Sequence, residues 1–255
     1  MIPREILFVD IGNSRIKWAR ASERGLVDPC EDLHIESPAT ALQSMVEVQP
    51  NNIGRLVAVN VAGPVLRSLL TEAAMNNWGI APEFVEPVRD GHGIRCGYSD
   101  PSQLGADRWV SLIAAYQLTK GAASVIDAGT TVTLDSVDAE GQHLGGLIMA
   151  GPQMVCAALH QGTDGIGKIS GALRRPADIS MLGTDTDKAV ANGAMLSVAS
   201  ALDRAIAVLG TGAKEQPTVY ITGGDARILS DWLETKTQYR ANLVLEGLAF
   251  VAVEG

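Results

Sequence analysis

A strand-and-turn pattern occurs twice in this chain, almost half a chain apart. Apolar residues 6–9 lead into DIGNS at residues 10–14, and residues 124–126 lead into DAGTT at residues 127–131. Each copy predicts a buried strand that ends in a carboxylate, followed by a glycine turn and a hydroxyl side chain. Such a turn lets backbone N–H groups approach an anion. Two such turns facing each other could hold the phosphates of a nucleotide.

The length of the chain and its alternating elements fit this duplication. The 255 residues, 46% of them hydrophobic, are enough to form two domains that each have a core. Strand-like and helix-like runs alternate in both halves, which indicates the α/β class. We place the two domains at residues 1–118 and 119–255.

Charge and cysteine content exclude several classes of partner. A net charge of -9 argues against binding to duplex nucleic acid or an anionic membrane, because either would need a basic face. Cys30, Cys96 and Cys156 form no CxxC pair, so neither a disulfide framework nor a zinc site is indicated. No export signal and no apolar run of about 20 residues stands out. We therefore expect a soluble, cytoplasmic protein.

The first turn has a functional and a structural interpretation. Asp10 ends a strand, where open sheets place their ligands, and it could hold Mg²⁺ directly or through water while Gly12, Asn13 and Ser14 contact phosphate. Asp-x-Gly-Asn is also ordinary hairpin chemistry, and for one copy alone that interpretation is favoured. The second copy shifts the balance toward phosphate binding.

A third glycine turn, TGGD at residues 222–225, follows a predicted strand and precedes a helix. It could pack against adenine or ribose, or it could simply need glycine for its dihedral angles, and the sequence does not choose between these. Neither a GxxxxGK[ST] loop nor a GxGxxG fingerprint is present. A Walker-type kinase and a Rossmann dehydrogenase are therefore both disfavoured.

The segment GADRW at residues 105–109 places a carboxylate and a guanidinium at a predicted helix start. The helix dipole and Arg108 both favour an ionised Asp107, which could accept a hydrogen bond from an attacking hydroxyl and orient it. Phosphoryl transfer depends mainly on such positioning. The structural alternatives are charge complementarity at the helix start for Asp107 and a surface ion pair for Arg108.

The four histidines lack metal-ligand spacing, so surface or core roles are expected for them: His34, His92, His143 and His160.

Five segments together carry a family resemblance. In chain order they are DIGNSRIKW (10–18), YSDPSQLGADRW (98–109), DAGTTVTLD (127–135), GGLIMAG (145–151) and ITGGDA (221–226). The chain resembles type III pantothenate kinase, a member of the superfamily of acetate and sugar kinases, heat-shock ATPases and actin. The resemblance implies two ribonuclease-H-like domains, with mixed sheets flanked by helices, around an ATP cleft. The implied reaction is ATP-dependent phosphorylation of pantothenate, the first step of coenzyme A biosynthesis.

The resemblance also implies roles for individual residues. Asp107 matches the catalytic base, Asp127 matches a site for K⁺ or NH₄⁺, and Asp10 would hold Mg²⁺ through the phosphates. The implied ATP-binding residues are Asp10, Ile11, Gly12, Asn13, Ser14, Arg15, Ile16, Lys17 and Thr130. The implied pantothenate-binding residues are Tyr98, Gly105, Ala106, Asp107, Arg108 and Thr186. Thr186, or alternatively Thr184, would reach the substrate from the other protomer of a homodimer.

Other functions remain open at this stage. A related kinase or phosphatase of the superfamily with another acceptor would use the same turns, although such relatives are usually longer. A nucleotide-binding accessory regulator of transcription could also retain them, but Asp107 argues against a purely regulatory role. Two departures from the family pattern stand out: Ser14 replaces the commoner Thr and keeps its hydroxyl, and Asp100 replaces the usual Asn, which would alter bonding within the loop.

Overall fold

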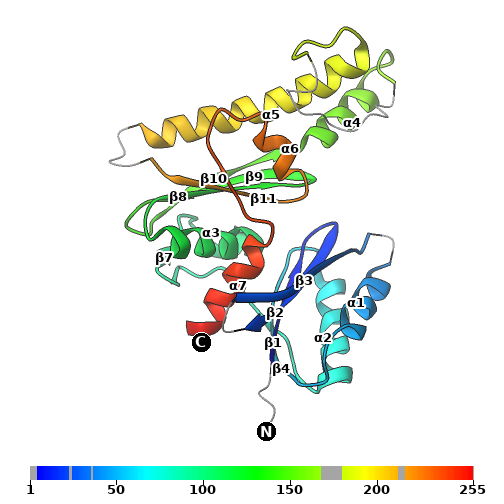
Figure 1. The fold of residues 1–255 in the computed structure, drawn as a ribbon, viewed down its shortest axis with the longest axis vertical. Helices are drawn as coiled ribbons and strands as arrows, with labels where there is room; N and C mark the ends of the chain where they lie inside the picture. The colour runs from blue at the N-terminus through cyan, green and yellow to red at the C-terminus, as the bar shows by residue number, and fades with distance from the viewer. Residues whose placement is uncertain (1–4, 23–24, 36, 168–179, 212–215, 255) are drawn as a thin grey trace. The chain divides into compact units, whose positions relative to one another are not determined.

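The computed structural model describes residues 5–22, 25–35, 37–167, 180–211 and 216–254. The chain forms two compact units (Figure 1). The first unit comprises residues 1–118 and 242–255, and the second comprises residues 119–241. Each unit is built around one mixed β-sheet.

The sheet of the first unit has five strands in the order β3-β2-β1-β4-β5. Their bounds are β1 (Glu5–Ile11), β2 (Arg15–Ser22), β3 (Gly25–Leu33), β4 (Ile53–Asn60) and β5 (Glu83–Phe84). β1, β2 and β3 form an antiparallel meander, whereas β4 pairs parallel to β1 and β5 parallel to β4. The strand and hairpin predicted around the first acidic turn are therefore present as β1 and β2.

Helices α1 (Pro38–Glu47) and α2 (Pro64–Trp78) pack on one face of this sheet. The apolar side chains of β1 alternate, and those of Leu7, Val9 and Ile11 share a core with the two helices. Proline occupies the first turn of α2, and Gly79 ends that helix in the left-handed conformation with φ 68°. Local sequence signals thus set both ends of α2.

In the described part of the first unit, a loop connects β5 to residue 105. The loop holds a small hairpin, β6 (Asp90–Gly91) and β7 (Ile94–Arg95), and the 3₁₀ turn η1 (Pro101–Gln103). Helix α3 (Ala106–Thr119) follows, with Asp107 in its first turn as expected.

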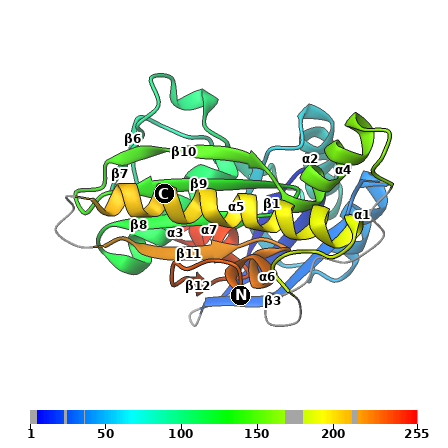
Figure 2. The same ribbon diagram turned by 90° about the horizontal axis from the view of Figure 1, so that it is seen from above.

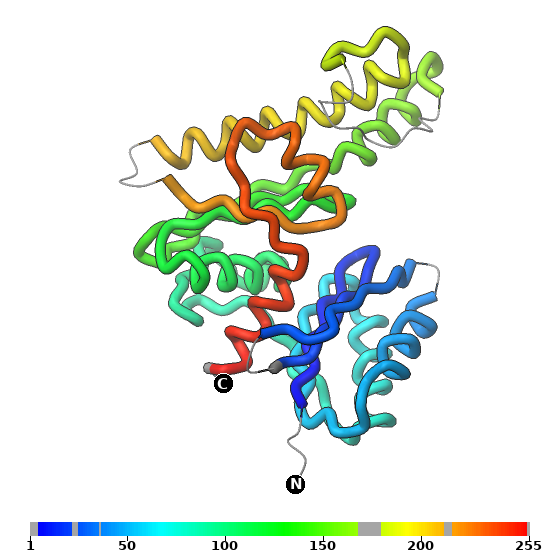
Figure 3. The backbone as a smooth tube through the Cα atoms, in the orientation of Figure 1, coloured from blue at the N-terminus to red at the C-terminus, as the bar shows by residue number. Residues whose placement is uncertain are grey.

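The C-terminal helix α7 (Leu243–Glu254) differs from the sequence-based domain division, which gave residues 119–255 to the second domain. It packs against β1, β2 and β3 and therefore belongs to the first unit, as the trace in Figure 3 shows. α7 also approaches α3 closely, since a Cβ at Gly247 would lie 2.2 Å from the Val110 carbonyl oxygen. α7 therefore covers part of the sheet of the first unit.

The sheet of the second unit repeats the first. Its strand order is β10-β9-β8-β11-β12, again an antiparallel meander followed by two parallel strands. The bounds are β8 (Ala123–Ala128), β9 (Thr131–Val137), β10 (His143–Ala150), β11 (Thr218–Thr222) and β12 (Gln238–Tyr239). β1 and β8 occupy equivalent places, so the repeated sequence pattern corresponds to a repeated topology.

In the described part of the second unit, this sheet is accompanied by α4 (Pro152–Gly162), α5 (Thr186–Gly210) and α6 (Ala226–Ser230). In Figure 2, α5 runs along the sheet, and its side chains Met195, Val198 and Leu202 share a core with Ile126 and Ile221. α4 packs against the first half of α5. Helix α5 is therefore the main cover of one sheet face.

Among the described residues, α5 is the one helix that is long and apolar enough to cross a membrane by length and composition alone. The sequence was expected to contain no apolar run long enough to cross a bilayer. α5, however, has 25 residues with a mean hydropathy of 1.4 in its most apolar window. Ala194, Met195, Ala199 and Leu202 of this helix are at most 1% exposed within the unit. A core helix of a globular domain gives the same pattern.

Candidate active site

The first acidic turn lies at the carboxyl end of β1. Asp10 is only 8% exposed and lies opposite Lys17 in the hairpin register. The Gly12 N–H donates to the Arg15 carbonyl at 3.0 Å, which closes the turn between β1 and β2. His34 contacts the same turn from the end of β3, because its Nε2 lies 2.7 Å from the Gly12 carbonyl oxygen.

The predicted ATP-binding residues of this turn fall into two groups. Asn13 and Arg15 are exposed and Ser14 is half-buried, so their side chains can reach a ligand. Ile11 and Ile16 are 0% exposed in the core, which leaves only their backbone groups for that role. Arg15 also forms a surface ion pair with Glu31 at 2.6 Å.

The second acidic turn occupies the equivalent place after β8. The Gly129 N–H donates to the Thr131 carbonyl at 3.0 Å, so this turn is one residue tighter than the first. The Thr130 carbonyl accepts from the Gly151 N–H at 3.1 Å, while Thr130 itself is exposed. A Cβ at Gly151 would lie 2.5 Å from the Gly129 carbonyl oxygen. The glycine before α4 therefore lets that backbone close onto the second turn.

The third glycine turn packs against the second one. Gly223 has φ +97°, and a Cβ there would lie 2.3 Å from the Ala128 carbonyl oxygen and 2.5 Å from Asp127 Oδ1. The Asp225 N–H donates to the same Ala128 carbonyl at 2.9 Å. Glycine is needed at position 223 for both its dihedral angle and this approach. The second unit thus gathers Asp127 and the turns at residues 129–130, 151 and 223 in one place.

Asp107 lies at the start of α3 and is half-buried. Its Oδ1 accepts a hydrogen bond from the Arg108 N–H at 2.8 Å, so the carboxylate folds back over its own helix end. A Cβ at Gly105 would lie 2.6 Å from that oxygen. The glycine before the helix therefore makes room for the carboxylate in this position.

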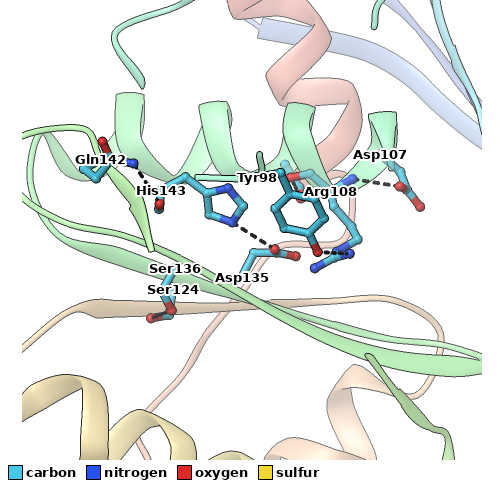
Figure 4. A network of polar contacts seen from close by, with 9 residues as sticks. Tyr98, Asp107, Arg108, Ser124, Asp135, Ser136, Gln142 and His143 are labelled. Carbon is cyan, nitrogen blue, oxygen red and sulfur yellow. Dashed lines mark hydrogen bonds and ion pairs between the residues drawn. The ribbon is translucent and has the colours of Figure 1, made fainter. Parts of the chain in front are cut away.

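Arg108 and Tyr98 meet in the same unit, as Figure 4 shows. Arg108 is 8% exposed, and its Nη1 donates to the Tyr98 hydroxyl at 3.2 Å with the guanidinium 5.9 Å from the ring centre. The expected alternative for Arg108, a surface ion pair, does not fit this burial. The structure thus brings together Tyr98 and the segment of residues 105–108.

Two further side chains hold the loop that carries Tyr98. Arg89 donates to the carbonyl oxygens of Cys96, Tyr98 and Ser99 at 3.1, 2.7 and 2.6 Å. Asp100 accepts from the Ser102 N–H at 3.0 Å and the Ser102 hydroxyl at 2.8 Å. The hydroxyl bond, reinforced by the N–H bond, lowers the pKa of the Asp100 carboxyl. The aspartate at position 100 therefore forms a side-chain cap for η1.

Figure 4 also draws a buried polar cluster of the second unit. His143 Nε2 lies 3.2 Å from Asp135 Oδ1, and the Ser124 and Ser136 hydroxyl groups lie 2.8 Å apart. These contacts join β8, β9 and β10. His143 therefore has the core role that was one of its two expected roles.

Thr186 lies at the first position of α5 and is exposed, as is Thr184. Asp185 caps this helix, since its side chain accepts from the Lys188 N–H at 2.8 Å and contacts Lys188 Nζ at 2.6 Å. The side-chain bond from Lys188 contributes most to lowering the pKa of the Asp185 carboxyl. Both threonines remain accessible, so the choice between them stays a prediction.

No cluster of three or more His, Cys, Asp or Glu side chains within the described part of the chain could hold a metal ion by itself. A lone carboxylate still fits Mg²⁺, which is usually bound by one or two carboxylates together with substrate phosphates. Asp10 provides such a carboxylate at a strand end. Asp127 and the Ala128 carbonyl, both next to Gly223, offer oxygen atoms of the kind that a monovalent cation prefers.

Comparison with known proteins decides the family. The sequence profile of type III pantothenate kinase matches residues 6–208. The chain is also similar to the type III pantothenate kinase of Nitrosococcus oceani, with 36% identity over 252 residues that cover 97% of this chain and 93% of the relative. The chain belongs to the type III pantothenate kinase family. The family expected from the five motifs is thus confirmed.

Solved structures confirm the fold class of this type III pantothenate kinase family member. One is described as a 2-dehydro-3-deoxygalactonokinase from Sinorhizobium meliloti, with TM-score 0.62, 14% identity and 98% of each chain covered. Another is described as a Baf family transcriptional activator from Campylobacter jejuni, with TM-score 0.59, 20% identity and coverage of 97% and 98%. At these identities the likeness extends to the fold alone.

His34 and Arg89 make contacts in the site region that the sequence did not predict. His34 contacts the first turn from β3, and Arg89 holds the loop of Tyr98. No local motif marks either residue: His34 contacts a turn 22 residues away, and Arg89 bonds carbonyl groups of an irregular loop. No sequence signal points to this role of His34, because β3, which precedes it, lacks the alternation of a half-buried strand.

Proposed function

We propose that this protein transfers the γ-phosphoryl group of ATP to the primary hydroxyl of pantothenate, the first step of coenzyme A biosynthesis. Membership of the type III pantothenate kinase family carries the proposal. Equivalent acidic turns after β1 and β8 support ATP as the donor.

The phosphates of ATP are assigned to the two acidic turns. Asn13 and Ser14 would bind from the first turn, and the exposed Thr130 from the second. When bound, Mg²⁺ would offset the charge of the β- and γ-phosphates, and Asp10 would hold it directly or through water. K⁺ or NH₄⁺ is assigned to Asp127. These assignments keep the residues that the family resemblance implied.

Asp107 is assigned the role of catalytic base. Its carboxylate would accept the proton of the pantothenate hydroxyl while that oxygen forms a bond to the γ-phosphorus. The bond between this phosphorus and the β–γ bridging oxygen breaks, and ADP leaves with the bridging oxygen. Tyr98, Arg108 and the backbone of residues 105–106 would orient pantothenate, whose carboxylate suits a guanidinium partner.

A homodimer is the assembly that the surface of the second unit supports. Apolar side chains are exposed on its edge strand β10 (Leu147 and Ile148), on α4 (Met154) and on α5 (Leu196). A second copy would cover them, and it would also cover the edge of the sheet. Thr186 would then reach the pantothenate site of the partner.

We place the enzyme in the cytoplasm, where its two substrates occur.

The acceptor is tested by incubating the purified protein with ATP, Mg²⁺, K⁺ and a panel of alcohols that includes pantothenate. We expect ADP release that depends on pantothenate, with a product heavier by one phosphoryl group in the mass spectrum. The same assay with Na⁺ in place of K⁺ should run slower. ADP release independent of pantothenate, or a phosphorylated product from another alcohol only, would overturn the proposal.

The reach of Thr186 is tested by complementation. Thr186→Val and Asp107→Asn proteins should each be impaired alone, but mixed dimers would contain one intact site. Random exchange makes half of the dimers mixed, so about a quarter of the wild-type activity should return on mixing. Sedimentation velocity verifies the dimer. Activity that does not recover in verified mixed dimers would show that Thr186 does not act across the interface.

A further inference from the structure

His34 is buried where its neighbours are not. His34 is 4% exposed, whereas its apolar neighbours in the chain, Leu33 and Ile35, are 56% and 66% exposed. Burial of a polar ring costs free energy unless the ring is hydrogen-bonded. The inversion of the usual pattern therefore indicates that a specific contact holds the imidazole in place.

That contact is with the first acidic turn. His34 Nε2 lies 2.7 Å from the Gly12 carbonyl oxygen, and the His34 main-chain N–H donates to the Ser14 carbonyl at 3.3 Å. Because a carbonyl oxygen only accepts, Nε2 is the nitrogen that carries the hydrogen. One residue thus binds two carbonyl groups of a turn that lies 20 to 22 residues earlier in the chain.

These two bonds set the direction of the backbone amides in the turn. In a trans peptide the C=O and the following N–H point in opposite directions. With the Gly12 and Ser14 carbonyls drawn toward His34, the N–H groups of Asn13 and Arg15 are turned away from β3. Backbone N–H groups that point outward from a turn, here two that are separated by Ser14, are donors of the kind that binds an anion.

We propose that His34 is a positioning residue for nucleotide binding, which acts by holding the first turn in its phosphate-binding conformation. It does not contact ATP itself. The inference rests on the proposed function to the extent that this turn binds the phosphates of a nucleotide. It does not depend on which alcohol accepts the phosphoryl group.

The test compares two substitutions of nearly equal shape. His34→Gln keeps a side-chain N–H donor, whereas His34→Met removes it, and His34→Leu serves as a second apolar variant if Met does not fold. Trp78→Phe is the matched control, because Trp78 Nε1 donates to the Pro50 carbonyl at 3.2 Å in the same unit. Pro50 precedes β4, so this bond lies at the opposite end of the sheet from Asp10.

Three quantities are measured: the dissociation constant of a non-hydrolysable ATP analogue with Mg²⁺, the KM values of ATP and pantothenate, and Tm. We expect His34→Met to weaken nucleotide binding and raise the KM of ATP about five- to tenfold, with the KM of pantothenate within about twofold. His34→Gln should restore most of the affinity. Trp78→Phe should lower Tm and leave nucleotide affinity unchanged.

Several results would overturn the inference. Wild-type affinity in His34→Met or His34→Leu would remove the role, and so would equal losses in the Gln and Met variants. If Trp78→Phe and His34→Met had the same Tm and lost the same nucleotide affinity, the effect of His34 would be on stability alone. If pantothenate is not phosphorylated but His34→Met still weakens nucleotide binding, the proposed acceptor fails and this inference stands. If the wild-type protein binds no nucleotide, both the proposed function and the role of His34 are contradicted.

Discussion

Replacing Gly223 with alanine tests whether the third glycine turn requires glycine at this position, in contrast to the neighbouring Gly224. The new Cβ would lie 2.3 Å from the Ala128 carbonyl oxygen and 2.5 Å from Asp127 Oδ1, far inside van der Waals contact. The backbone φ of +97° adds strain, because residues with a Cβ rarely adopt it. Gly224 is the matched control, since a Cβ there meets no atom within 4 Å.

The size of the effect follows from two contributions. Holding a non-glycine residue in a sparsely populated conformation costs about 1–3 kcal/mol, and overpacking against fixed backbone costs about 1–3 kcal/mol more. Each kcal/mol shifts Tm by about 2–4 °C in a chain of this size. We therefore expect Gly223→Ala to lower Tm by at least about 5 °C. Gly224→Ala should stay within about 2 °C of the wild type.

Thermal unfolding followed by circular dichroism measures both variants. Because the clash displaces Asp127 Oδ1, Gly223→Ala should also lose the stimulation by K⁺ that is proposed for this carboxylate. If Gly223→Ala and Gly224→Ala melted at the same temperature, the close approach of the third turn to β8 would be wrong. The proposed cation site at Asp127 and the Ala128 carbonyl would then lose its geometric support.

Three further substitutions probe the acceptor side of the site. Asp107→Asn keeps an oxygen acceptor for the Arg108 N–H but loses the negative charge, so kcat should fall at least about 100-fold with nucleotide affinity unchanged; normal turnover would refute the base role. The new Cβ of Gly105→Ala would displace the Asp107 carboxylate, so we expect kcat/KM to fall up to about 100-fold with Tm nearly unchanged. Wild-type kinetics in this variant would contradict the expected role of Gly105. Arg89→Gln releases the loop of Tyr98, which should raise the KM of pantothenate about three- to tenfold and spare that of ATP; equal changes in both KM values would argue against a local effect.

Much of the fold and of the site could be predicted because the signals are local. An apolar run that ends in Asp-x-Gly specifies a buried strand and a turn within about ten residues, and this occurs at Asp10 and Asp127. The helical spacing after residue 106 likewise placed Asp107 in the first turn of α3. Each of these features depends on near neighbours in the chain, so sequence patterns report it directly.

The strand β3 shows where such signals fail. It is an exposed edge strand with Pro29 in its middle and Asp28 at φ 49°, so it lacks the alternation of a half-buried strand. Edge strands need polar residues to avoid further pairing, and this requirement erases the usual pattern. The contact of His34 with Gly12 therefore became visible only once β3 was paired with the hairpin.

The sequence by itself determined the two acidic turns, the Asp107 helix start and membership of the type III pantothenate kinase family. The tertiary structure alone decided that α7 packs on the sheet of the first unit, that Gly223 closes onto Asp127, and that His34 holds the first turn. The physical reason is the range of the interactions. Turn and helix preferences act over a few residues, whereas packing and long-range hydrogen bonds join segments whose separation along the chain carries no pattern.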